Sequence, residues 1–321
     1  MMRYGFLILF VTLSLFMFTD ETARETSLAN RSESSPALPL PSTQPGPAPS
    51  GGEPATPLFD PDLRVPVFMY HEVVPDDEQI EVPATHVTVG ELKSQLVYLQ
   101  KKGYTAVTLE DLYEFMTHRK PLPAKPVVIT FDDGYRSFYE LVYPMLRELN
   151  YKASLSLING PMNEYGAYYY VSWSQVREMT GSGLVEITSH TGSHRLLGKL
   201  TDDAELKNEL AGSREEIAKY LGWKPEIIVY PVGSYNTRVI QAAKAAGYKM
   251  GITMEKGVNK YGDSVWEIKR ILVRHGDTGE DLLKKLNYIS LTKLFYFLER
   301  ISGPARRRRK QYKATGGGGN G

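Results

Sequence analysis

The chain has 321 residues, of which 42% are hydrophobic, 23% charged and 11% aromatic. These values exclude a fully disordered chain, a collagen and a protein of many membrane spans, and the length favours one large domain with tails. The net charge is +1, but six basic residues fall in 301–321, so the remainder is mildly acidic and gives no support to a nucleic-acid partner. Cysteine is absent, so any metal must be bound by histidine and carboxylate side chains.

The N-terminal segment, residues 1–22, is predicted to be a signal peptide or an N-terminal membrane anchor. Residues 4–18 form an uncharged apolar run behind an arginine, short for a membrane span of about 20 residues but suited to the core of a signal peptide. We therefore expect an exported protein that is extracellular, on the cell surface or attached to the membrane through this run, with cleavage left open. Residues 23–62 are predicted to be a linker, because ten of the twenty prolines fall in 36–66.

The body of the chain, residues 63–280, alternates β-branched runs with amphipathic patterns, which is typical of βα units around a parallel sheet. Seven or eight strands favour a distorted (β/α) barrel over an open doubly wound sheet. Strands are expected at 65–71, 104–109, 127–132, 152–157, 184–190, 227–231, 249–254 and 268–273. Helices are expected at 89–102, 109–118, 138–150, 172–181, 202–221 and 236–246, with capping boxes at Thr88 and Ser172. No glycine-rich nucleotide loop follows any expected strand.

Two segments follow the body. Residues 281–301 have the pattern of an amphipathic helix, and 302–321 form a basic, glycine-rich tail that we expect to be disordered. The basic run fits a solvated charge cluster better than a specific site for an anionic lipid or wall polymer.

Two of the expected strands end in side chains that can bind a metal. Asp132 and Asp133 follow an apolar run, although by themselves they also fit an Asp-Gly turn. His190 and His194 follow another strand, four residues apart, a spacing that lets both imidazoles face one point. Active sites of such barrels lie at the carboxyl ends of the strands, so the four side chains are expected to lie together. A His-His-Asp set with open positions is typical of a catalytic metal ion.

Residues 130–135 (TFDDGY) and 190–194 (HTGSH) resemble the first two signature motifs of the polysaccharide deacetylases. These are metal-dependent enzymes that remove acetyl groups from sugar polymers, and their fold is a distorted (β/α) barrel. The resemblance covers about residues 65–275. It implies one catalytic base, Asp132, and three metal ligands, Asp133, His190 and His194. The metal implied is a divalent ion, most often Zn²⁺, with Co²⁺ or Ni²⁺ as alternatives.

The proton donor has two candidates. Residues 67–71 (VFMYH) look like the exported poly-N-acetylglucosamine deacetylase branch, which makes His71 the expected catalytic acid. A fifth family motif is mimicked at 272–275 and would make His275 the acid instead. His275 follows Trp266 by only nine positions, too few for the helix that normally intervenes, so we prefer His71, with a purely structural histidine as its alternative.

The third motif departs from the family pattern. Residues 229–233 (VYPVG) lack the arginine that normally orients the base, which we interpret as a trait of the branch. Four residues are predicted to contact substrate or to stabilise the oxyanion, namely Tyr135, through its backbone N–H, Tyr230, Pro231 and Trp266. Aromatic residues in 165–173 fit sugar stacking and core packing equally well.

The expected reaction is metal-dependent hydrolysis of N-acetyl groups from an extracellular poly-N-acetylglucosamine, such as a biofilm exopolysaccharide, releasing acetate. Peptidoglycan is the second candidate substrate and xylan a distant third. A non-catalytic carbohydrate-binding module is the alternative from another class. A glycosidase is disfavoured, because the adjacent Asp132 and Asp133 cannot lie on either side of a glycosidic bond. Oligomeric state is left open.

Overall fold

The computed structural model describes residues 57–286 except 78–81 and 166–168. The predicted signal peptide or anchor, most of the linker and the basic tail therefore lie outside the described residues, and these assignments stay predictions. Residues 279–286 are helical, while the rest of the predicted C-terminal helix falls outside the described part. Within that part, no helix is both long enough and apolar enough to cross a lipid bilayer.

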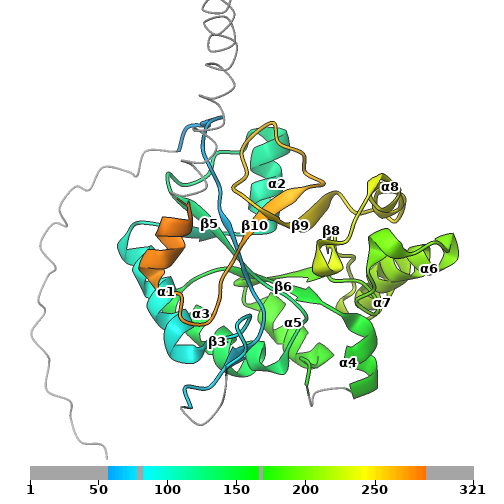
Figure 1. Cartoon of the computed structure of the whole chain (residues 1–321), viewed down its shortest axis with the longest axis horizontal. Coiled ribbons are helices and arrows are strands. Elements are labelled where there is room, and N and C mark those ends of the chain that lie inside the picture. Colours follow the sequence, from blue (N-terminus) through cyan, green and yellow to red (C-terminus); the bar gives the residue numbers. More distant parts are fainter. Residues whose placement is uncertain (1–56, 78–81, 166–168, 287–321) are drawn as a thin grey trace, which may run out of the picture. The chain divides into compact units, whose positions relative to one another are not determined.

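A parallel sheet of eight strands forms the centre of the fold, with helices around it (Figure 1). Seven strands close into a barrel in the order β1-β10-β9-β8-β7-β6-β5, because β1 also pairs with β5. The eighth, β4, pairs with residues 126–128 at the start of β5. The strands are β1 (Val67–Tyr70), β4 (Thr105–Val107), β5 (Pro126–Phe131), β6 (Ala153–Leu157), β7 (Val185–Ser189), β8 (Ile227–Val229), β9 (Met250–Lys256) and β10 (Ile268–Leu272). The predicted distorted (β/α) barrel is confirmed, and each expected strand is present.

The helices follow the predicted ranges closely. They are α1 (Val89–Lys101), α2 (Leu109–His118), α3 (Tyr143–Leu149), α4 (Asn159–Tyr165), α5 (Trp173–Gly181), α6 (Asp203–Lys207), α7 (Ser213–Leu221) and α8 (Thr237–Ala245). Thr88 and Ser172 form the expected capping boxes. The sequence did not indicate α4, the short parallel pair of β2 (Val73–Val74) and β3 (Val87–Thr88), or two π-helical turns, η1 (Phe138–Val142) and η4 (Asn208–Gly212).

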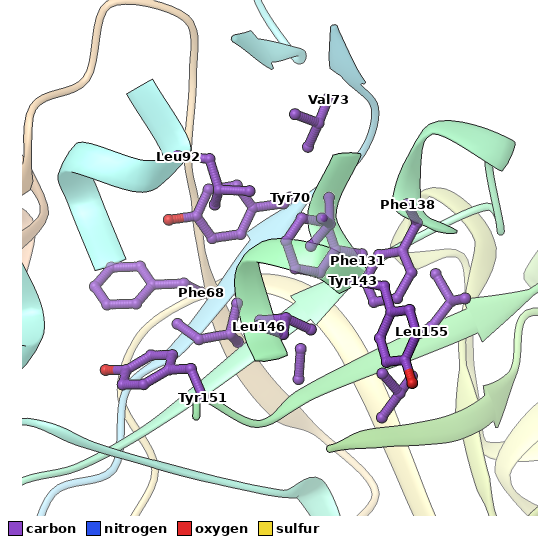
Figure 2. Close-up of a cluster of buried hydrophobic side chains, with 14 of the residues drawn as sticks. Phe68, Tyr70, Val73, Leu92, Phe131, Phe138, Tyr143, Leu146, Tyr151 and Leu155 are labelled. Atoms are coloured by element: carbon purple, nitrogen blue, oxygen red, sulfur yellow. The ribbon is translucent and has the colours of Figure 1, made fainter. Parts of the chain in front are cut away.

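An aromatic cluster on the outer side of β1 and β5 determines where Asp132 points (Figure 2). The ring of Phe131 stacks on Tyr70 at a centroid distance of 5.0 Å and meets Phe138 edge to face at 5.0 Å. Successive side chains of a strand point to opposite faces, so burial of Phe131 outside the barrel turns Thr130 and Asp132 toward its interior. The apolar packing of β5 thus places a carboxylate at the carboxyl end of the barrel.

Candidate active site

Three predicted metal ligands come together at the carboxyl ends of β5 and β7. Oδ1 of Asp133 lies 3.5 Å from Nε2 of His190 and 3.7 Å from Nε2 of His194. The ligand atoms of all three residues lie within 4.8 Å of one another, and the described ranges hold no second group of this kind. The structure therefore brings together the three side chains that the sequence suggested.

The two histidines are prepared to act as ligands. Nδ1 of His190 lies 2.8 Å from the carbonyl oxygen of Val229, to which it donates, so Nε2 is left as the free acceptor facing Asp133. Burial lowers the pKa of His190 to about 4 and also lowers the pKa of His194. Both rings are therefore neutral at pH 7, the form that binds metal. Two imidazole nitrogens and one carboxylate oxygen suit Zn²⁺, and they also suit Co²⁺ or Ni²⁺.

The pKa of Asp133 is shifted upward, whereas that of the adjacent Asp132 is shifted downward. Burial and the adjacent charge of Asp132 raise the pKa of Asp133, while a hydrogen bond from the Tyr135 side chain opposes the rise. Its backbone is left-handed, with φ of 75°, and is followed by Gly134 at φ of 81°. A cation at this position would favour the ionised carboxylate, which fits Asp133 as a ligand.

Asp132 differs from the three ligands in its partner, which is Arg270. Nη1 of Arg270 lies 2.8 Å from Oδ1 of Asp132, and their side chains are only 1% and 3% exposed. Burial opposes ionisation of Asp132, but the charge and the hydrogen bond of Arg270 outweigh it and hold the pKa of Asp132 well below the usual range. Nε of Arg270 also donates to the carbonyl oxygen of Thr253 at 2.8 Å, which fixes the guanidinium. Asp132 is thus an ionised, oriented carboxylate.

Arg270 was missed in the sequence analysis, which found no arginine to orient the base. The third motif has Val229 at that position, and its carbonyl oxygen holds His190 instead. A signal was present, because Arg270 lies two residues after the apolar Ile268 in the same strand and so shares its face. A charged residue on the inner face of a barrel strand is costly unless it is paired, which points to a buried carboxylate partner.

Replacing Arg270 with methionine should move the acid limb of the pH profile of kcat/KM upward. Without the guanidinium, burial raises the pKa of Asp132, so the carboxyl binds a proton at higher pH and the base is lost as the pH falls. Activity near pH 6 should drop by about tenfold or more. Arg274→Met, an exposed arginine just after β10, is the matched control, and Arg270→Lys should retain part of the activity. An unchanged acid limb in folded Arg270→Met would contradict this role.

The structure places His71, and not His275, beside the carboxylates. The backbone N–H of Asp132 donates to the carbonyl oxygen of Tyr70 at 3.0 Å, so the ends of β1 and β5 adjoin. A positive charge on His71 lowers the pKa of both Asp132 and Asp133. Nδ1 of His71 is buried and has no hydrogen-bond partner among the described residues. His275 is 43% exposed, with Nδ1 3.0 Å from the Glu91 carboxylate at the start of α1.

The remaining predicted site residues lie in different settings. Tyr230 and Pro231 are buried. The Tyr230 hydroxyl packs so closely against Gly251 that a Cβ atom added to this glycine would lie only 2.1 Å from the hydroxyl oxygen. Their side chains therefore support the wall of the barrel and do not face a polymer. Trp266 precedes β10, and Nζ of Lys244 lies 5.2 Å from the centroid of its ring.

The aromatic segment after β6 divides between surface and core. Tyr170 stacks on Tyr135 at 6.0 Å, and Arg136 N–H donates to the carbonyl oxygen of Tyr169 at 2.9 Å, so this segment lies directly beside the Asp133 loop. Tyr169 is 59% exposed there, whereas Trp173 stacks on Tyr220 at 4.3 Å. Tyr168 and the side chain of Tyr165 lie outside the described residues.

Comparison with known proteins identifies the family. A family model described as polysaccharide deacetylase matches residues 119–251, which contain both aspartates and both histidines. The chain is 31% identical over 216 residues to YxkH of Bacillus subtilis, which is named as a polysaccharide deacetylase, and the match covers 67% of this chain and 74% of that protein. The chain belongs to the polysaccharide deacetylase family. The predicted family and the prediction of an enzyme are confirmed.

Two further relatives are informative about the branch. The deacetylase is 29% identical over 255 residues to the poly-β-1,6-N-acetyl-D-glucosamine N-deacetylase of Escherichia coli K12, a match that covers 68% of this chain but only 38% of that protein. The fold of the present chain is similar to that of the Streptococcus pyogenes deacetylase PplD, solved in complex with acetate, with a TM-score of 0.64 and 26% identity. That match covers 72% of this chain and 99% of PplD.

Proposed function

We propose that this deacetylase is a metal-dependent hydrolase of N-acetyl groups on an exported N-acetylglucosamine polymer, and that it releases acetate. The observation that carries the proposal is the division between two adjacent aspartates. Asp133 lies with His190 and His194, whereas Asp132 is paired with Arg270. A ligand carboxylate and a separate ionised carboxylate are what hydrolysis of an amide at a metal centre requires.

The residues have complementary roles in this mechanism. Asp133, His190 and His194 would hold a divalent cation, which when bound supplies Lewis acidity and lowers the pKa of water from 15.7 toward about 7. Asp132 accepts the proton of the attacking water, and Arg270 keeps its carboxylate ionised and oriented. The backbone N–H of Tyr135 stabilises the developing oxyanion, an interaction worth about 3 kcal/mol in comparable sites. His71 donates a proton to the departing amine.

The proposed polymer is a β-linked poly-N-acetylglucosamine exopolysaccharide. Support comes from the name of the E. coli relative and from His71 beside the carboxylates. Tyr169 adds an exposed aromatic ring next to the site, suited to the apolar face of a sugar. Peptidoglycan is the second candidate. Export rests on the apolar run at 4–18.

The proposal predicts acetate release that depends on metal. The purified protein should release acetate from β-1,6-linked N-acetylglucosamine oligomers, lose this activity with a chelator and regain it with Zn²⁺, Co²⁺ or Ni²⁺. His190→Ala and His194→Ala should lose metal and activity together, because a site with three protein ligands tolerates little loss. Peptidoglycan fragments and acetylated xylan are the comparison substrates. A wild-type protein without bound metal, inactive on each substrate after metal addition, would overturn the proposal.

A further inference from the structure

The loop that joins the two histidine ligands has an unfavourable backbone conformation. Thr191 and His194 have φ of 71° and 60°, in the left-handed region that residues other than glycine rarely adopt. Thr191 is β-branched, which makes this conformation especially unfavourable. Since His194 is itself a proposed ligand, its position depends on whatever holds residues 191–194 in this shape.

Each backbone N–H of this loop has an acceptor, and one residue supplies two of them. The donors and acceptors are Thr191 to Ser189 Oγ at 3.2 Å, Gly192 to the carbonyl oxygen of Glu209 at 3.2 Å, Ser193 to Oε2 of Glu209 at 2.9 Å, and His194 to Thr191 Oγ1 at 3.0 Å. The Ser193 hydroxyl donates to Oε1 of Glu209 as well. Both oxygens of the Glu209 carboxylate are therefore bound to Ser193, the residue directly before His194.

Glu209 is an unusual residue to find in this position. It is 5% exposed, and among the ion pairs of the described residues none involves its carboxylate. A buried carboxylate bound by neutral donors alone is costly compared with a neutral side chain of the same shape. The negative charge of Glu209 would attract a cation bound at the nearby ligands. The same charge opposes the lowering of the pKa of His194.

The helix that carries Glu209 is interrupted at this residue. The segments α6, η4 and α7 follow one another without a break from Asp203 to Leu221, and the central one is a π turn. A π turn accommodates an extra residue in a helix and is often found at functional sites. Here it carries both the side-chain and the backbone acceptors of Glu209 to the ligand loop.

We propose that Glu209 is a positioning residue that holds residues 191–194 in the conformation presenting His194, and thereby sets the metal affinity of the site. This inference rests on the proposed metal dependence. It predicts that metal affinity falls when Glu209 is changed although the three ligands are untouched.

The test is Zn²⁺ affinity of Glu209→Gln, measured by competition with a chromophoric chelator at a temperature where the protein is folded. The amide keeps the size of the side chain but loses the charge and one acceptor oxygen, so the Kd for Zn²⁺ should rise about 10-fold to 100-fold. The absorption spectrum of the Co²⁺-loaded protein should change too, because the position of His194 changes. Glu215→Gln, on α7 and 62% exposed, is the matched control and should bind Zn²⁺ like the wild type.

Ser193→Ala provides a second, milder variant. It removes the hydroxyl donor but keeps the backbone N–H, so its loss of affinity should be smaller than that of Glu209→Gln. If Glu209 acts through Ser193, the double variant should lose less than the sum of the two single effects on the free energy of binding. Wild-type Zn²⁺ affinity in both single variants would overturn the inference. If Glu209→Gln does not fold, wild-type Zn²⁺ affinity in Ser193→Ala alone would overturn it. Failure of the wild type to bind Zn²⁺ would instead overturn the proposed function.

Discussion

Replacing Asp132 with asparagine should lower turnover by about 100-fold or more while the metal stays bound. Asp132 is paired with Arg270 and lies outside the ligand group, so its loss removes a base and no ligand. Asparagine has the same shape and cannot accept the proton of the attacking water. Replacing Asp133 with asparagine should instead weaken metal binding, because Oδ1 of Asp133 faces Nε2 of both histidines.

Metal content and turnover must be measured on the same preparations to separate these roles. Metal is determined by elemental analysis after dialysis, and turnover by acetate release in excess Zn²⁺. Asp263→Asn, which changes a carboxylate in the loop between β9 and β10, should alter neither quantity and serves as the control. Equal loss of metal in Asp132→Asn and Asp133→Asn would show that the roles of the two aspartates are assigned wrongly.

The sequence predicted the barrel and the grouping of Asp133, His190 and His194 because their signals are local. Apolar runs such as 126–131 identify buried strands, and Thr88 and Ser172 are visible as helix caps. Asp133, His190 and His194 each follow such a strand, and parallel strands in one barrel bring their carboxyl ends together. Local pattern plus one general rule of the fold was therefore sufficient to group these side chains, whereas the choice of Asp133 over Asp132 as a ligand came from the family resemblance.

Arg270 and Glu209 were missed because their roles depend on contacts between distant parts of the chain. In the barrel order, β10 lies next to β1, which lies next to β5, so Arg270 reaches Asp132 across an intervening strand. No spacing within the sequence reveals that pairing. The π turn that carries Glu209 breaks the 3.6-residue period on which helix prediction depends. The roles of both residues are therefore visible only in the tertiary structure around the site.

The position of Arg270 also explains how the third motif can lack its arginine. All strands of a barrel direct alternate side chains to the same interior, so an orienting cation can come from any strand that reaches the base. Here β10 supplies it, and β8 supplies the Val229 carbonyl oxygen for His190. The departure at 229–233 is therefore compatible with an oriented base.

Replacing His71 with alanine should lower kcat by about 100-fold or more and change KM little, because protonation of the amine matters only in the transition state. His71 follows β1 beside Asp132, and its buried Nδ1 has no partner in the described part of the chain. His275→Ala is the matched control and should be mild, since His275 is exposed and engaged by Glu91. Kinetics on N-acetylglucosamine oligomers measure both variants.

A substrate with a better leaving group separates proton donation from a structural role. The 4-nitrophenolate of 4-nitrophenyl acetate departs without protonation, so His71→Ala should retain most of its activity on this ester while losing activity on the amide. A structural defect would lower both activities together. If His275→Ala abolished turnover and His71→Ala left it nearly intact, His275 would be the acid. Placement in the exopolysaccharide branch would then fail, and peptidoglycan would become the leading substrate.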